Sequence, residues 1–399
     1  MISKRLQASL DGAVCIRDIF EEGKKLAAIY GKENIFNFSI GNPNVAPPAI
    51  VNETLKEILD TEDPLTLHGY PANVGHPDVR QCIADHLNNR YHTNYTVDGI
   101  VMTSGAASAL SILCNTFLDQ DDEVITFAPY FWEYKSYVET MYGKLVPALC
   151  DQMTLQPDPQ TFEAAFSPKT RMVFMNTPNN PTGAVYTEES IREVARIMEQ
   201  KEKEYGHPIY LVSDEPYRLL AYGGLTVPYL PHYYKNTIVV YSYSKTLSIP
   251  GERVGYIAME GNVADFENVI AGITASIRYL GYVNAPSLQQ KMLLKCVDAS
   301  VDVSIYEKNR DLLYQSLTDI GYECIHPDGA FYLFMRSLEP DDARFCDRAK
   351  EEKILMAPGT AFGGPGFVRV SYCVPYDVVE RSIPAFKRLY DKYQADKNA

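Results

Sequence analysis

The sequence predicts an α/β protein with two parts. Helices cover both faces of a mostly parallel sheet in the large domain, and the second domain is smaller and α+β. Three observations lead to this prediction. The middle of the chain alternates β-branched apolar runs with amphipathic helical patterns, whereas the tail beyond about residue 290 places helices first and strands after them. The 399 residues are 46% hydrophobic, which is enough for a core of this size.

Five short runs in the middle of the chain predict strands that are buried on both faces. Their apolar residues continue without polar alternation, which is typical of strands in a parallel sheet. The runs are EVITFAP (123–129), RMVFMN (171–176), PIYLVSD (208–214), TIVVYSYS (237–244) and RVGYIAM (253–259).

Segment 188–206 shows the helical pattern most clearly, with Gly206 suited to its end. Charged residues take one face of this helix and apolar residues the other, namely Ile191, Val194, Ala195 and Met198. In the tail, 330–336 and 367–372 predict strands, and a closing helix is expected near 376–393. We therefore expect an N-terminal arm with part of the small domain at 1–45, a large ligand-binding domain at 46–288 and the small domain at 289–399.

Charge and apolar patterning disfavour several classes of function. The chain has 37 Lys and Arg against 51 Asp and Glu, a net charge of -14, which is the wrong sign for holding nucleic acid by its phosphates. No apolar run approaches the roughly 20 residues that cross a bilayer, and Asp11, Arg17 and Asp18 interrupt the N-terminal segment. We expect a cytoplasmic protein with no nucleic-acid or membrane partner. Its eight cysteines and seven histidines lack metal-ligand spacing, so no metal is predicted.

Two loops that follow strand-like runs carry groups suited to a ligand, because open α/β sheets bind ligands beyond the carboxyl ends of their strands. In 100–118 a Ser-Gly turn opens an Ala/Leu-rich helix, whose free N–H groups suit a phosphate. A turn without a ligand is the alternative. In 176–187 two prolines fix the backbone around Asn179 and Asn180, and a merely rigid loop is the alternative there.

Two further loops carry ionisable groups. Asp214 ends a strand-like run and Tyr217 follows three residues later, although a carboxylate at this place could simply cap a turn. Lys245 stands among hydroxyls, with Arg253 eight residues downstream. A lysine that is partly removed from water near another cation has a lowered pKa, and its amine can form a Schiff base with a carbonyl compound. A solvated surface lysine is the alternative.

One ligand would use all four loops. It would have an aldehyde for the lysine, a pyridine nitrogen for the carboxylate, a ring hydroxyl for the phenol and amide, and a phosphate for the helix N-terminus and arginine. This ligand is pyridoxal 5'-phosphate.

The order of these motifs resembles the class I/II aminotransferases among the fold-type-I pyridoxal-phosphate enzymes, in particular those similar to aspartate and aromatic aminotransferases. The motifs are SGA, NNPTG, SDEPY, SYSK with arginine eight residues after the lysine, and FVRVSY. Five motifs in register make the resemblance specific, and it extends from about Asn37 to the C-terminal helix.

The resemblance implies roles for the residues around the cofactor ring. Lys245 would form the Schiff base and move the proton between the substrate Cα and the cofactor. Asp214 would pair with the ring nitrogen. Tyr217 and Asn180 would hydrogen-bond the ring oxygen, with Asn180 also contacting the substrate. A phosphate cradle is implied at Gly105, Ala106, Ala107, Ser242 and Arg253.

It also implies the walls of the site. Phe131 would stack on the ring, although a shift of one residue would give that role to Trp132. Gly41 would belong to the segment that closes over the substrate, and Arg369 would bind the substrate α-carboxylate. Tyr70 would reach the phosphate of a partner subunit, which implies a homodimer.

Two departures from the family pattern stand out. Ala106 and Ala107 offer only backbone N–H groups to a phosphate, where many relatives have a side-chain donor. The second arginine that reads a side-chain carboxylate in dicarboxylate-specific members is not evident, and Arg278 is a candidate by residue type only. The amino donor and the 2-oxo acid acceptor therefore stay open.

We expect a transaminase that moves an amino group from an aspartate-like, aromatic or broader range of L-amino acids to a 2-oxo acid such as 2-oxoglutarate, by a ping-pong mechanism. Two alternatives remain. A carbon-sulfur β-lyase would use the same lysine and carboxylate. A ligand-sensing aminotransferase-like domain would normally accompany a DNA-binding domain, and about 35 residues before the resemblance are too few for one.

Overall fold

The computed structural model describes residues 2, 6–7 and 16–397, so most of the first fifteen residues of the expected N-terminal arm lie outside it. A seven-stranded sheet forms its centre, in the order β2-β8-β7-β6-β5-β3-β4. Only β8 runs antiparallel to its neighbours β2 and β7. The strands are β2 (Ile100–Thr103), β3 (Glu123–Ala128), β4 (Lys144–Leu149), β5 (Thr170–Asn176), β6 (Tyr210–Asp214), β7 (Thr237–Ser242) and β8 (Gly255–Met259). The expected mostly parallel sheet is confirmed.

The strands of this sheet are buried on both faces, as their composition predicts. In β7, Ile238 and Val240 join one hydrophobic cluster, while Val239 and Tyr241 join another on the opposite face. Strand β4 is the exception and the sequence did not predict it. It lies at the sheet edge, its residues are mostly exposed or half-buried, and it contains Pro147. Proline cannot donate to a ladder and is tolerated at such an edge.

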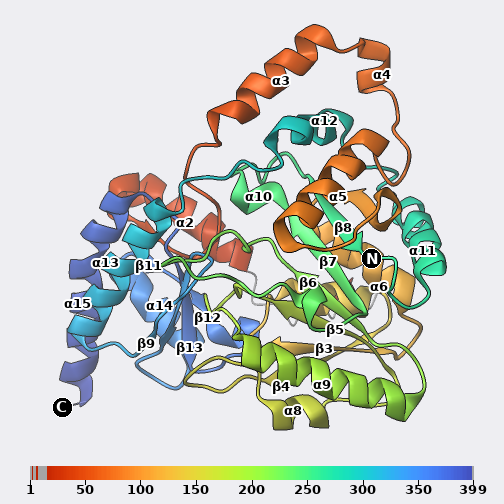
Figure 1. The fold of residues 1–399 in the computed structure, drawn as a ribbon. Helices are drawn as coiled ribbons and strands as arrows, with labels where there is room; N and C mark the ends of the chain where they lie inside the picture. Colours follow the sequence, from red (N-terminus) through yellow and green to blue (C-terminus); the bar gives the residue numbers. More distant parts are fainter. Residues whose placement is uncertain (1, 3–5, 8–15, 398–399) are drawn as a thin grey trace.

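Helices cover the sheet on both sides (Figure 1). One face packs against α6 (Ala106–Phe117), α7 (Glu133–Thr140) and α11 (Phe266–Tyr279). On the other face, α8 (Pro159–Ala164) and α9 (Glu188–Tyr205) cover one part. The remainder is covered by α3 (Ala49–Thr61), α5 (Pro77–Tyr91) and α12 (Ser287–Cys296). Two shorter helices complete this part, α4 (Pro64–His68) and α10 (Tyr243–Thr246).

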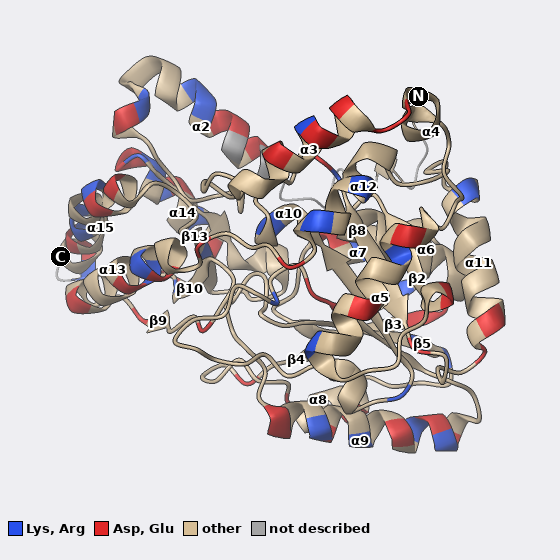
Figure 2. Ribbon diagram, turned by 45° about the horizontal axis from the view of Figure 1, so that its top comes forward, with Lys and Arg blue, Asp and Glu red and all other residues tan. Residues whose placement is uncertain are grey.

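The predicted helix at 188–206 is confirmed as α9. Its end has the expected cause, because Gly206 takes a left-handed conformation with φ of 72°. At its start, the hydroxyl of Thr187 accepts a hydrogen bond from the Ser190 N–H. Acidic and basic residues are interspersed along the ribbon of α9 in Figure 2, and many of these charged residues are exposed, consistent with a solvated face.

The C-terminal part forms a smaller α+β unit beside the large sheet (Figure 1). Its antiparallel sheet has the order β12-β13-β10-β9, and β1 pairs with β11 in a separate parallel ladder. The strands are β1 (Phe36–Asn37), β9 (Cys324–Ile325), β10 (Tyr332–Arg336), β11 (Ile354–Leu355), β12 (Ala357–Pro358) and β13 (Phe367–Ser371). Its helices are α2 (Ile16–Tyr30), α13 (Ser304–Ile320), α14 (Asp342–Glu351) and α15 (Tyr376–Lys397).

The division at residues 45 and 288 stays a prediction, and the packing of α12 favours a later second boundary. Met292, Leu293 and Cys296 of this helix are buried in the same cluster as Val51 of α3 and Ile83 of α5. After α12 the chain joins the cluster of the C-terminal sheet from Val301 onward, and this cluster also includes the earlier residues Phe38, Tyr217, Leu220 and Tyr222. We therefore infer that the small unit starts after α12. Of the helices within the described residues, none is long and apolar enough to cross a membrane.

Candidate active site

A cavity of about 570 Å³ opens beyond the carboxyl ends of the central parallel strands. Asn176, Asp214 and Ser242, the last residues of β5, β6 and β7, all line it. The small unit closes its other side with Tyr332 of β10 and Arg369 of β13. Parallel strands end at the same edge of a sheet, so side chains that are far apart in the sequence meet there.

Asp214 is buried at the end of β6 with one oxygen left for a ligand. Its Oδ2 accepts a hydrogen bond from the hydroxyl of Tyr134 at 2.6 Å. Within the described part of the chain, no group donates to its Oδ1. Burial raises the pKa of Asp214 to about 7, an effect that the Tyr134 donor opposes and the nearby Glu215 carboxylate increases. A cationic N–H donor in the cavity would satisfy Oδ1 and stabilise the ionised carboxylate.

Lys245 lies on α10, which begins directly after β7 with Ser242 as its N-cap. Its Nζ donates to the carbonyl oxygen of Gly41 at 2.7 Å. Removal of the amine from water lowers the pKa of Lys245 to about 8, and the cations Arg369 and Arg253 contribute to this shift. An appreciable fraction of neutral amine therefore faces the cavity near neutral pH, ready to attack a carbonyl carbon.

The start of α6 can hold an anion. Gly105, the residue before the helix, has φ of 85°, and a Cβ there would lie 2.8 Å from Nη2 of Arg253. The positive φ favours glycine at this turn, and the missing side chain leaves room for the Arg253 guanidinium. The first N–H groups of a helix have no partner within it, and Ala106 and Ala107 at this end of α6 line the cavity. Arg253 is held beside them, because its Nη2 donates to the carbonyl of Ser104 at 3.1 Å.

Arg369 carries a buried guanidinium whose Nε–H is available to a ligand. Its Nη1 donates to Oδ1 of Asn180 at 2.9 Å, and its Nη2 to the carbonyl of Ser39 at 2.7 Å. Its carbon atom Cζ lies 4.7 Å from the ring centre of Tyr332 and 4.6 Å from that of Phe362. No described residue accepts from its Nε. The group is thus held in one orientation and suits a carboxylate ligand.

Both aromatic residues proposed to stack on a ligand ring line the cavity. The ring centres of Phe131 and Trp132 are 6.3 Å apart. Phe131 also makes an edge contact with Tyr134 at 5.6 Å, and Tyr134 reaches Asp214. Phe131 therefore lies toward the Asp214 end of the cavity, which favours it for stacking on a ring whose nitrogen meets Asp214.

Three residues of the predicted site do not line this cavity: Gly105, which directly precedes the lining residue Ala106, and the more distant Tyr70 and Arg278. Tyr70 follows α4 and is 91% exposed, and Arg278 lies in the last turn of α11. Neither belongs to the cavity wall that the described residues form. The role expected for Tyr70 needs a second subunit, and Arg278 was a candidate by residue type only, so both roles stay predictions.

Three residues of the site were not identified from the sequence. Tyr134 contacts Asp214, Tyr332 contacts Tyr217, and Asn176 donates from Nδ2 to the carbonyl of Asp214 at 2.8 Å. Asn176 could have been identified from the sequence, because it is the last residue of a strand that leads into a ligand-binding loop. The tyrosines had no such signal, because the chain has 29 tyrosines and most serve packing equally well.

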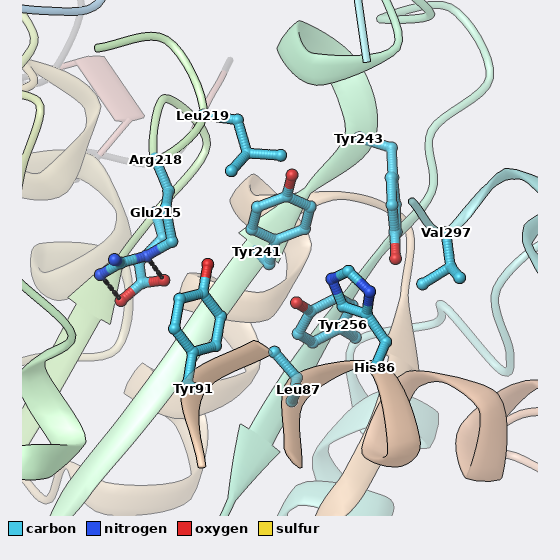
Figure 3. A pocket seen from close by; sticks show the side chains of 10 residues that line it. All are labelled: His86, Leu87, Tyr91, Glu215, Arg218, Leu219, Tyr241, Tyr243, Tyr256 and Val297. Atoms are coloured by element: carbon cyan, nitrogen blue, oxygen red, sulfur yellow. Dashed lines mark hydrogen bonds and ion pairs between the residues drawn. The ribbon is translucent and has the colours of Figure 1, made fainter. Parts of the chain in front are cut away.

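At the end of β6 and in the loop after it, side chains point to two opposite sides. Asp214 and Tyr217 face the large cavity, while Glu215 and Arg218 form a buried ion pair on the far side. Nη2 of Arg218 donates to Oε1 of Glu215 at 2.8 Å, and Ser213 donates to the same oxygen at 2.6 Å. Figure 3 shows the pair beside a group of aromatic side chains around a cavity of about 10 Å³: Tyr91, Tyr241, Tyr243, Tyr256 and His86. This pair anchors the loop that carries the two ligand-facing residues.

Known proteins resemble this chain along most of its length. Residues 33–386 match the family model of aminotransferase class I and II. The probable aspartate aminotransferase of Methanocaldococcus jannaschii is 30% identical, over 98% of this chain and 100% of its own length. The aromatic-amino-acid aminotransferase 2 of Thermococcus litoralis is 28% identical, over 90% of this chain and 92% of its own.

Solved structures agree with the sequence relatives. An aminotransferase of Eubacterium rectale has a TM-score of 0.95 and 46% identity, covering 98% of this chain and 99% of its own. The aspartate aminotransferase of Thermus thermophilus with maleate has a TM-score of 0.86 and 26% identity, over 98% and 99% of the two chains. The match with the family model covers most of the sequence, including the loops that form the cavity. The chain therefore belongs to the class I and II aminotransferases and is an amino-acid transaminase.

Proposed function

We propose that this transaminase uses pyridoxal 5'-phosphate and works by a ping-pong mechanism. Its donor would be an aspartate-like or aromatic L-amino acid and its acceptor a 2-oxo acid such as 2-oxoglutarate. One observation carries the proposal: the Lys245 amine, whose pKa is lowered, faces the same cavity as Oδ1 of Asp214, an oxygen to which no described residue donates. The names of the relatives, which include aspartate and aromatic aminotransferases, support this range of donors.

The residues of the cavity fit this cofactor by their chemistry. The unpartnered Oδ1 of Asp214 suits the N–H of a pyridinium ring, and the N-terminus of α6 with Arg253 suits a phosphate. Tyr217 and Asn180 would hold the ring oxygen. When bound, pyridoxal phosphate supplies an electron sink for the electrons of the substrate Cα–H bond.

The protein's own groups would then do the following work. Lys245 would anchor the cofactor aldehyde, give way to the substrate amine, and carry the proton from the substrate Cα. Asp214 would keep a proton on the ring nitrogen. Arg369 would bind the substrate α-carboxylate and so orient the Cα–H bond, while Gly41 would cover the substrate from the N-terminal side.

We further propose that two subunits form each site. Tyr70 is a large aromatic residue that is 91% exposed in the single chain, and Tyr279 beside Arg278 is 82% exposed. Exposed aromatic groups of this size are typical of surfaces that another protein covers. In the dimer, Tyr70 would reach the phosphate of the other subunit.

The test begins with covalent capture. The purified protein is reduced with borohydride and digested, and a pyridoxyl-phosphate group is sought by mass spectrometry. We expect it on the peptide with Lys245, and we expect none in Lys245→Ala. Lys235→Ala is the matched control, because Lys235 does not line the cavity, and it should keep the adduct. No adduct in the wild-type protein after incubation with excess cofactor would refute the proposal.

Substrate assays then separate the transaminase from the β-lyase. A panel of amino donors is offered with 2-oxoglutarate, and glutamate is measured. We expect turnover that depends on the 2-oxo acid, with aspartate or aromatic donors most active. Release of pyruvate and ammonia from a cysteine-type substrate without a 2-oxo acid would favour the lyase instead.

A further inference from the structure

The hydroxyls of Tyr217 and Tyr332 form a buried pair at the cavity wall. Their oxygens are 2.7 Å apart, and the two residues are 4% and 2% exposed. Tyr217 lies in the loop after β6 of the large sheet, whereas Tyr332 lies on β10 of the small sheet. Both line the cavity. The hydrogen bond therefore joins the two parts of the molecule at the site.

Proton counting sets the direction of this hydrogen bond. A phenol has one proton to donate, and its oxygen can also accept. If Tyr217 donates to the ring oxygen of the cofactor, its proton is used, so it can only accept from Tyr332. Tyr332 must then be the donor of the pair, and its donation makes Tyr217 a stronger donor in turn.

The surroundings of Tyr332 favour this direction. Burial raises the pKa of Tyr332 to about 12, while Arg369 and the hydrogen bond with Tyr217 lower it. Burial raises the pKa of Tyr217 well above its ordinary value, and there the hydrogen bond with Tyr332 raises it further. The Arg369 guanidinium, whose Cζ lies 4.7 Å from the ring centre of Tyr332, stabilises negative charge on that phenol and so favours it as the donor of the pair.

Packing holds the Tyr332 hydroxyl in place. A Cβ on Gly41 would lie 2.0 Å from that oxygen, so the backbone of Gly41 passes directly beside it. The carbonyl of Gly41 accepts from Lys245, and Arg369 lies over the Tyr332 ring. Tyr332 is therefore wedged between the segment proposed to cover the substrate and the arginine proposed to bind it.

We propose that Tyr332 is a positioning residue that donates to Tyr217 and thereby directs the Tyr217 proton to the ring oxygen of the cofactor. The inference rests on the proposed use of pyridoxal phosphate. Its consequence is electrostatic, because a stronger donation to the ring oxygen stabilises its negative charge. The protonated form of the linkage between cofactor and Lys245 then becomes easier to deprotonate, and its pKa falls.

The test is a spectrophotometric pH titration of that linkage in the protein without substrate. Tyr332→Phe removes one oxygen and keeps the ring beneath Arg369. We expect the pKa of the linkage to rise by about half a pH unit to one unit, the range that corresponds to the loss of one ordinary hydrogen bond. Gly41→Ala is a second variant, because its methyl group would displace the Tyr332 hydroxyl, and it should shift the pKa in the same direction.

A double-mutant comparison separates action through Tyr217 from a general disturbance. In a Tyr217→Phe background, Tyr332→Phe should add no further shift. Tyr222→Phe is the matched control. Tyr222 is also a buried tyrosine, packed in the hydrophobic cluster of the small unit; its hydroxyl donates to the Ala330 carbonyl, and it does not line the cavity. We expect it to leave the pKa of the linkage unchanged.

The outcomes distinguish this inference from the proposed function. If wild-type protein forms the linkage but Tyr332→Phe titrates like wild type, only the role of Tyr332 is refuted. An equal shift from Tyr332→Phe with and without Tyr217 would also refute it. Failure of the wild-type protein to form any linkage would refute the proposed cofactor, and the inference with it.

Discussion

The pKa of Lys245 gives a quantitative prediction for cofactor capture. Burial and two nearby arginines lower it from 10.5 to about 8. At pH 7.5 this raises the neutral fraction of the amine from about 0.1% to about 24%, a gain of about 200-fold over a solvated lysine. The neutral amine is the nucleophile, so the protein should react with the cofactor aldehyde about 200 times faster than its ordinary basicity would allow.

The measurement uses protein from which the cofactor has been removed. Stopped-flow absorbance measures the rate at which the cofactor attaches to Lys245 between pH 6 and 10. The reaction of the cofactor with a simple alkylamine is the reference, because it shows how pH affects the cofactor itself. Because the amine loses its proton as pH rises, the rate should increase about tenfold per pH unit at low pH and level off above about pH 8. The alkylamine should continue to rise beyond that point. A protein rate that rises in parallel with the alkylamine up to pH 10 would show that Lys245 is solvated and refute the reasoning.

Three further predictions concern individual residues. Arg369→Lys should lower kcat/KM for amino acids about 10- to 100-fold, because a lysine cannot reproduce the fixed, planar guanidinium that binds a carboxylate with two hydrogen bonds. An equal loss of bound cofactor would contradict a role in substrate binding. Tyr134→Phe should raise the pKa of Asp214 in the cofactor-free protein by about one to two units, since it removes a donor to the carboxylate, and carboxyl NMR titration measures this. Arg218→Met should lower the free energy of unfolding by about 3–5 kcal/mol in denaturant titrations, because the Glu215 charge is left buried; the double variant with Glu215→Gln should lose less.

Sequence patterns predicted most of the large sheet because the signals are local. The five runs became β3, β5, β6, β7 and β8, since uninterrupted apolar residues need burial on both faces wherever they are in the chain. Strand β4 escaped prediction because its Pro147 argues against a central strand, and only its place at the edge makes it compatible with pairing. The packing of α12 on α3 and α5 could not be predicted from the sequence either. A helical pattern shows that one face is apolar but not which element covers that face.

For the site, sequence motifs identified the main chemical groups but not the contacts between them. Lys245, Asp214 and Arg369 were identified because each stands at a fixed offset from a motif. Packing of the fold sets these contacts: Tyr134 donates to one oxygen of Asp214, no described residue donates to the other, and the hydroxyls of Tyr217 and Tyr332 meet. These are contacts between residues 80 and 115 positions apart, and their geometry depends on how helices and the small sheet pack against the large one. A hydrogen bond changes over tenths of an ångström, whereas sequence spacing fixes positions only along the chain.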